Sequence, residues 1–367
     1  MAAKKIGILT FHCAHNYGAV LQTYATVRLL ADAGHEVEVI DYRPDYLVKP
    51  YRRFDLSRFY GKDIISTCRH LVSECLLFPV RLARYSAFEM FINGRFNLSE
   101  RVTPGTVENR YDTVLIGSDQ VWNKKITGGS LDGMYFADPA LWKNQSRFIA
   151  DAVSMESETL SDSDASYIKN IHERFSALSV RESQLSSLLD SRCGVKARHV
   201  QDPVIQVNPQ VWKEIARPQR ASRPYILVYR LRDHHTIDPF VKKLASRTGA
   251  EVGEVTPFPD GRKLVKARQC ESVEGFLGLL AGASYVVTTS YHAMLFAVIF
   301  SRPFYCFRFG TGQDTRQASF LKSVGLEDRM LSLGDDVPED DGCDFSEAMV
   351  RLEELRRESS EFILNSL

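Results

Sequence analysis

Four short polar segments follow apolar runs of the kind that form buried strands, and their side chains could carry out acid–base chemistry on an anionic substrate. They are His12–Gln22, Gly117–Asn123, Ser179–Glu182 and Thr288–Ala293. In open parallel sheets, ligands bind beyond the carboxyl ends of the strands and beside helix N-termini. We therefore expect the four segments to meet at one site.

Two residues in these segments could transfer protons. His292 follows three hydroxyl residues, Thr288–Ser290, and an imidazole in that setting can hold an anion and titrate near neutral pH. Asp119 could accept the proton of a substrate hydroxyl, and we expect the nearby Trp122 to be exposed and to stack on a sugar ring. The alternatives are structural: a satisfied core histidine, an aspartate that caps a helix, and a buried tryptophan.

Two further residues indicate an anion site. Arg181, at a strand end, can make a forked contact with a carboxylate or a phosphate, the alternative being a surface pair with Glu182. Gly18 lets the backbone approach a ligand closely, and the helix that begins there offers unpaired N–H groups to an anion. The alternative for Gly18 is a turn that merely caps the helix.

The composition argues against several classes of protein. Lys and Arg together number 46, as do Asp and Glu, so no net charge is available to attract nucleic acid. The seven cysteines form no CxxC pair, and we expect free thiols in a cytoplasmic protein without a metal site. No apolar run reaches the roughly 18 residues that cross a bilayer, and the first residues predict a buried strand instead of a signal peptide.

Strands and helices alternate in both halves of the chain. Lys5–Thr10, Gly18–Ala33 and Glu36–Asp41 have the apolar spacing of a strand, a helix and a strand, which implies a parallel pair with a right-handed crossover. The same rhythm returns between Tyr225 and Phe307. The predicted fold class is therefore α/β, with two doubly wound Rossmann-like domains and a cleft between them.

The chain divides into three parts and one insertion. We predict an N-terminal domain over residues 1–178, a C-terminal domain over 179–344, and a final helix, 345–367, that packs back on the N-terminal domain. Residues from about 44 to 105 form a helical insertion, and we interpret its many arginines as parts of solvated helix faces, the alternative being a dedicated anion patch. The helices of the insertion are expected at Ile64–Leu77 and Val80–Asn93.

The polar segments together resemble those of the polysaccharide pyruvyltransferase family. The similarity covers Ile8–Gln22 (ILTFHCAHNYGAVLQ), Ile116–Asn123 (IGSDQVWN), Ser179–Glu182 (SVRE), Asp202-Pro203, Thr289–Ala293 (TSYHA) and Ile299–Phe304. It runs in consistent order from about residue 4 to residue 330, and the combination of GSDQVW with NYGA is fairly specific.

The resemblance implies a two-domain fold like that of the GT-B glycosyltransferases, with the site in the cleft. It implies phosphoenolpyruvate as the donor and co-substrate, no other cofactor, no obligatory metal, and a sugar acceptor that is lipid-linked or nucleotide-linked. The reaction would place a pyruvyl ketal on two sugar hydroxyls, in the cytoplasm or at the inner face of the cell membrane. The alternatives are a nucleotide-sugar-dependent glycosyltransferase of the same fold and a sugar-binding homologue without activity.

Chemistry and resemblance together suggest a role for each candidate residue. His292 and Asp119 are the expected catalytic residues. Donor-binding residues are expected at Asn16, Gly18, Arg181, Ser290, Arg308 and Arg316. Acceptor-binding residues are expected at His12, Gln22, Ser118 and Trp122.

Two departures from the family pattern affect these roles. Where many members read SYAASFG, this chain reads IADAVSM, with Ala150 or Asp151 in the place of the tyrosine. Some members also carry an arginine two places before the motif histidine, where this chain has Ser290. We therefore expect another cation, Arg308 or Arg316, to serve the donor.

Overall fold

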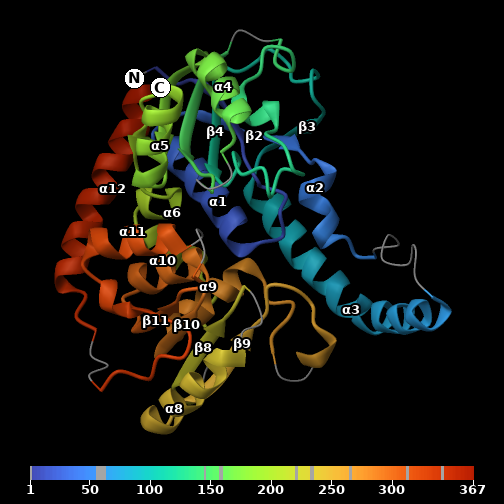
Figure 1. The fold of residues 1–367 in the computed structure, drawn as a ribbon, viewed down its shortest axis with the longest axis vertical. Helices are drawn as coiled ribbons and strands as arrows, with labels where there is room; N and C mark the ends of the chain where they lie inside the picture. The colour runs from blue at the N-terminus through green and yellow to red at the C-terminus, as the bar shows by residue number, and fades with distance from the viewer. Residues whose placement is uncertain are drawn as a thin grey trace.

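Two parallel β-sheets form the cores of two domains, and helices pack against each of them (Figure 1). The seven-stranded sheet has the order β3-β2-β1-β4-β5-β6-β7, and the five-stranded sheet has the order β12-β11-β10-β8-β9. The predicted α/β fold class with two doubly wound domains is therefore confirmed. The computed structural model describes residues 2–54, 63–143, 146–156, 160–219, 222–231, 235–263, 267–310, 314–339 and 343–367.

The first domain is built on the larger sheet. Its strands are β1 Lys5–Leu9, β2 Glu36–Tyr42, β3 Leu98–Val102, β4 Thr113–Asp119, β5 Arg147–Val153, β6 Phe175–Val180 and β7 Arg198–His199. Its helices are α1 Tyr17–Asp32, α2 Asp45–Val48, α3 Ile64–Arg95, α4 Asp162–Ile171 and α5 Ser183–Cys193.

The second domain follows two short connecting helices, α6 Pro203–Gln206 and α7 Gln210–Ile215. Its strands are β8 Tyr225–Tyr229, β9 Glu251–Val255, β10 Tyr285–Thr288, β11 Phe304–Phe307 and β12 Met330–Leu331. Its helices are α8 Asp238–Thr248, α9 Val273–Gly282, α10 Tyr291–Ile299 and α11 Asp314–Val324, and α12 Ser346–Ser366 ends the chain.

Burial and capping explain why the strand ends are held rigidly. The central β4 contains a run, Val114–Ile116, with no exposed surface, as expected for a parallel strand covered on both faces. The first helix, α1, begins after Asn16, whose side chain accepts hydrogen bonds from the backbone N–H groups of Gly18 and Ala19. β1 pairs in parallel with β4, from Ile6 opposite Thr113 to Leu9 opposite Ile116, so the segments that follow the two strands begin side by side.

The boundary between the domains differs from the prediction. Residue 178 lies inside β6, which pairs with β5 on one side and with β7 on the other. The first domain therefore continues to His199. The sequence indicated a strand at this place, but the alternation of strands and helices does not show which of two sheets a strand joins.

The insertion is helical, but it contains one long helix instead of the two expected. α3 runs through Pro79 without ending. Proline has no N–H to donate to the carbonyl four residues earlier, which here belongs to Cys75. Pro79 and Cys75 both lie on the exposed side of the helix, so this carbonyl can bond to water instead. The insertion also contains β3, which the sequence did not predict. Residues 55–62 of the insertion lie outside the described part of the chain.

The last helix returns to the first domain. α12 packs against α6 and α11, and the backbone carbonyl of Leu367 accepts hydrogen bonds from the side chains of Lys4 and Arg147. The two ends of the chain consequently lie side by side (Figure 1). Among the described helices, none combines the length and the apolar character that crossing a membrane requires.

Candidate active site

A pocket with a cavity volume of about 160 Å³ lies between the two sheets, at the carboxyl ends of their central strands. Asp119, at the end of β4, lies on one wall, and His292, at the start of α10, lies on the other. The two residues are therefore brought together as the sequence predicted. The pocket is lined further by Asn16, Tyr51, Gln120, Ser290, Tyr291, Arg316 and Gln317.

Asp119 is held in an unusual backbone conformation. Its φ angle is +75°, in the left-handed region that few residues with a side chain adopt. Its Oδ1 atom accepts a hydrogen bond from the backbone N–H of Gln120 at 2.9 Å and lies 3.5 Å from Nη2 of Arg181. Such conformations concentrate at functional sites, and here the turn presents the carboxylate to the pocket.

His292 lies in the first turn of α10. Ser290 caps this helix by accepting a hydrogen bond from the N–H of Ala293 at 3.4 Å. The positive end of the helix dipole, which favours anions, is therefore at the pocket. Ser290 also lines the pocket, and its contact with a donor anion stays a prediction.

The imidazole of His292 crosses from the second domain to the first. A Cβ atom on Gly18 would lie only 2.1 Å from Nδ1 of His292. Gly18 is therefore required because the imidazole packs against it. The expected approach of a ligand to this glycine is not what the structure shows, and Asn16 already caps the N–H groups that were expected to be free.

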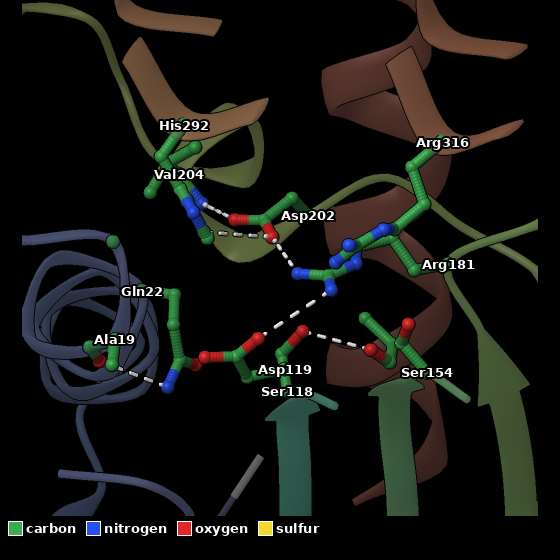
Figure 2. Close-up of polar contacts among 12 residues, drawn as sticks. Ala19, Gln22, Ser118, Asp119, Ser154, Arg181, Asp202, Val204, His292 and Arg316 are labelled. Atoms are coloured by element: carbon green, nitrogen blue, oxygen red, sulfur yellow. Dashed lines mark hydrogen bonds and ion pairs between the residues drawn. The ribbon is translucent and has the colours of Figure 1, made fainter. Parts of the chain in front are cut away.

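One buried carboxylate links His292 to Arg181 (Figure 2). Oδ2 of Asp202 lies 3.4 Å from Nε2 of His292 and 2.6 Å from Nη1 of Arg181. Because Arg181 also lies 3.5 Å from Asp119, the four side chains form a continuous chain of ionisable groups beneath the pocket. A carboxylate at one ring nitrogen fixes the orientation of an imidazole and the position of its proton.

Arg181 does not line the pocket, and its side chain is fully buried. Burial opposes its charge, but Asp202 and Asp119 raise the pKa of Arg181 above its ordinary value. Burial alone would raise the pKa of Asp202, but His292 and Arg181 hold it well below its ordinary value. The expected direct contact between Arg181 and the donor is therefore not made, and Arg181 instead supplies a fixed charge that holds two carboxylates in place.

Among the arginines that the structure describes, Arg316 lines the pocket. It lies in α11, with Nε 3.8 Å from Oε1 of Glu182 and its guanidinium 5.8 Å from the ring centre of Tyr291. Arg308 follows β11, is exposed, and does not line the pocket. Of the two arginines predicted to serve the donor, the structure thus places only Arg316 where it can do so.

Trp122 is not available to a sugar. Its side chain is 1 % exposed, its Nε1–H donates to the carbonyl of Tyr135 at 2.9 Å, and its ring stacks on Phe136 at 4.6 Å between centres. Both partners belong to a 3₁₀ turn, Gly133–Phe136, that covers the indole. The predicted stacking of Trp122 on the acceptor is therefore wrong, and the structural alternative holds.

Three other residues assigned to the acceptor are also buried away from the pocket. His12, Gln22 and Ser118 have no exposed surface, and their side chains form hydrogen bonds within the protein, although Oε1 of Gln22 has no partner in the structure. His12 bonds to Asp41, and Ser118 donates to the carbonyl of Ala152. Gln22 donates to Thr10, Ala19 and Thr23. They support the strand ends, and the predicted contact with the acceptor is not made.

Asp151 is a buried carboxyl group that the sequence marked only as a departure from the family pattern. Burial, together with the nearby Asp202, raises the pKa of Asp151 to about 7, although a hydrogen bond from Ser179 opposes the rise. The Oγ–Oδ1 distance of that bond is 3.2 Å, and Oδ2 has no hydrogen-bond partner in the structure. The pKa of Asp151 therefore lies near neutral pH, and Asp202 is close enough to influence it.

Sequence reasoning missed two residues of the site. Asp202 was noted only as part of a matching Asp-Pro pair, although an aspartate before proline and an apolar run is also the signal of a helix cap, and it caps α6. Tyr51 lies in the insertion and lines the pocket, and no spacing pattern pointed to it. Among the described residues, no three His, Cys, Asp or Glu side chains are grouped so that they could hold a metal ion.

Comparison with known proteins gives one match at the level of a family. Residues 16–309 match the family model described as Polysaccharide pyruvyl transferase. No curated protein matches the sequence.

Several solved structures share the arrangement of elements at low identity. UDP-GlcNAc 2-epimerase from Neisseria meningitidis, bound to UDP-GlcNAc, is 10 % identical with a TM-score of 0.49, over 99 % of this chain and 99 % of that chain. UGT89C1 from Arabidopsis thaliana is 10 % identical with a TM-score of 0.46, over 98 % and 95 % of the two chains. The heptosyltransferase WaaC from E. coli is 12 % identical with a TM-score of 0.36, over 84 % and 89 %.

Proposed function

The chain belongs to the polysaccharide pyruvyl transferase family, and we propose that it transfers a pyruvyl group from phosphoenolpyruvate onto two hydroxyls of a sugar to form a ketal. One observation carries the proposal. A candidate base, Asp119, and a candidate acid, His292, come from different domains and line the same pocket. The start of α10 and Arg316 add positive charge beside them, where a donor with a phosphate and a carboxylate would lie.

The reaction needs a proton on the donor before carbon–oxygen bonds can form. His292 donates a proton to the methylene carbon, which becomes the methyl group, and C2 becomes electrophilic. A sugar hydroxyl attacks C2, and Asp119 takes its proton. Phosphate then leaves C2, and a second hydroxyl attacks the same carbon. One of the two hydroxyl protons replaces the proton that His292 gave up, and the other departs with the phosphate.

The buried carboxylate and arginine position these groups. Nδ1 of His292 packs against Gly18, whereas Nε2 lies 3.4 Å from Asp202 and makes no hydrogen bond in the structure. Nε2 is therefore the atom that would carry the transferred proton, and Asp202 would orient the ring. Arg181 lies next to both Asp202 and Asp119 and fixes the separation of acid and base. Arg316 lies where it can stabilise the departing phosphate.

The test is a comparison of donors. We expect phosphoenolpyruvate to raise the melting temperature of the protein and to release phosphate when a suitable sugar is present. Replacement of His292 by Ala should lower the rate of phosphate release by about 10²–10⁴. Stabilisation by UDP or GDP sugars but not by phosphoenolpyruvate would favour a glycosyltransferase and refute the proposal.

A further inference from the structure

A second hollow adjoins the active-site pocket. It consists of two adjoining cavities, each of about 210 Å³, that share His15, Tyr51, Arg52 and Tyr85. The insertion forms most of its wall, and Phe258 and Pro259 of the second domain close one side. We call it the arginine groove. Tyr51 also lines the active-site pocket, so the groove and the pocket are neighbours on either side of this side chain.

The arginine groove carries an excess of positive charge. Among the residues that the structure describes, one carboxylate, Glu89, and six arginines line it. The arginines are Arg43, Arg52, Arg53, Arg81, Arg84 and Arg101. Three of the arginines pair with carboxylates within 4.0 Å: Arg43 with Asp41 and Glu89, Arg52 with Asp45, and Arg81 with Glu74. Arg53, Arg84 and Arg101 have no such partner among the residues that the structure describes.

Arg84 is the least expected of these charges, because it is only 4 % exposed. Its guanidinium donates to the carbonyls of His15 in the first domain and Gln269 in the second, each at 3.2 Å, while Nε has no hydrogen-bond partner in the structure. Carbonyl groups stabilise a buried cation without neutralising it. The interpretation of the insertion's arginines as solvated side chains is therefore wrong for Arg84.

Aromatic rings accompany the charges. Tyr51 stacks on Phe258 with ring centres 5.7 Å apart and planes 15° apart, so the two domains meet across the groove. The guanidinium of Arg53 lies 4.6 Å from the ring centre of Tyr85. Such faces suit the flat apolar side of a sugar or a base, next to cations that suit phosphate oxygens.

We propose that the arginine groove binds the diphosphate of the acceptor, while the acceptor's sugar lies past Tyr51 in the active-site pocket. The acceptor is then a diphosphate-linked sugar, carried either by a nucleoside or by a lipid. This proposal rests on the proposed function, because it assigns the second substrate of the same site. Unpaired arginines in two adjoining cavities match a diphosphate better than a single phosphate group.

The first experiment measures binding without turnover. The full chain is titrated with inorganic pyrophosphate by calorimetry at constant ionic strength, with and without saturating phosphoenolpyruvate. The variant Arg53→Gln/Arg101→Gln removes two of the unpaired charges, and we expect it to bind pyrophosphate at least about tenfold more weakly. The matched control Arg192→Gln/Arg223→Gln, which changes two exposed arginines elsewhere, should bind normally.

Two results would overturn the proposal. One is equal binding by the wild type and the groove variant. The other is displacement of pyrophosphate by phosphoenolpyruvate, which would place the diphosphate in the donor pocket instead.

The second experiment identifies the carrier. Pyruvyl transfer is compared for a UDP-sugar, a prenyl diphosphate sugar and a methyl glycoside, and the groove variant should raise KM only for the first two. A second variant replaces Val72 and Leu76, which are 59 % and 64 % exposed on α3, by Ser. It distinguishes a lipid carrier from a nucleoside carrier, because a nucleotide does not need this apolar surface. A KM increase confined to the prenyl substrate indicates a lipid carrier.

The two proposals can fail separately. Pyrophosphate binding that depends on Arg53 and Arg101, without any pyruvyl transfer, would leave the groove standing and refute the reaction. Equal use of the methyl glycoside and the diphosphate sugars, unaffected by the groove variant, would support the reaction and refute the groove.

Discussion

Gly18→Ala tests whether the imidazole of His292 must pack against the first domain. The added methyl carbon would lie 2.1, 2.5 and 2.6 Å from Nδ1, Cγ and Cε1 of His292. Ordinary contacts between such atoms are about 3.5–4.0 Å, so the ring or the domains must move by roughly 1.5 Å. A displacement of about 1 Å at a reacting group can reduce the rate by about 10²-fold, and we expect a loss of that size in kcat/KM.

The assay is phosphate release from phosphoenolpyruvate, together with thermal unfolding. The melting temperature should stay within a few degrees of the wild type, because Ala favours a helix over Gly by about 1 kcal/mol. Gly94→Ala is the matched control, since this glycine of α3 has no atom within 4 Å of an added Cβ, and it should retain full activity.

A double substitution isolates the contact. In a His292→Ala background the imidazole is gone, so Gly18→Ala should cause little further loss of activity or stability. If Gly18→Ala alone is as active as the wild type, or if it reduces the rate equally with and without His292, the packing argument is refuted.

Three further predictions follow from the charges around the site. Asp202→Asn should destabilise the fold by about 3–5 kcal/mol in urea unfolding, because its buried arginine partner loses a counter-charge, whereas Asp162→Asn at an exposed pair should change stability by less than about 0.5 kcal/mol. The pKa of Asp151 is raised to about 7, so the folded protein binds more protons than the unfolded chain between pH 4 and 7. This group therefore lowers the stability of the fold as the pH rises through that range. We expect Asp151→Asn to be more stable than the wild type at pH 8 but not at pH 4. Arg316→Gln should weaken phosphoenolpyruvate binding about tenfold in calorimetry, and Arg308→Gln should leave it unchanged; equal effects would contradict the assignment.

The positions of the site's acid and base could be predicted from the sequence because they depend on a local rule. Asp119 and His292 each follow a strand, and parallel strands point their carboxyl ends to the same edge of a sheet. That rule requires only the order of elements along the chain. The rule does not by itself bring together residues of two different sheets, and the expectation that they meet in a cleft came from the family resemblance.

The residues that the sequence misplaced depend on contacts between segments far apart in the chain. Trp122 and Asp119 follow the same strand, but only Trp122 is buried, by a turn that begins at Gly133. The sequence does not show which of the two side chains this later turn covers. Arg181 also follows a strand, but its guanidinium forms a buried ion pair with Asp202 and does not face the pocket. Residue types alone do not show such a pairing. Gly18 was singled out for the close approach of a ligand, but the group that approaches it is an imidazole from the other domain.

The insertion shows the limit of composition as evidence. Its arginines and aromatic residues were visible, but composition does not distinguish a solvated cation from one that is buried against another domain. Arg84 is distinguished by carbonyl partners from both domains, and these partners become adjacent only after folding. Tyr51 likewise joins the pocket and the groove through its position alone.

The most direct test of the central claim is the mass of the product formed in heavy water. The protein is incubated in D₂O with phosphoenolpyruvate and a panel of free and diphosphate-linked sugars, and the products are weighed. We predict a sugar that carries one pyruvyl ketal with one solvent deuteron in its methyl group, and no such product from the His292→Ala variant. A product that has gained a sugar instead, or a ketal without deuterium in its methyl group, would contradict the account.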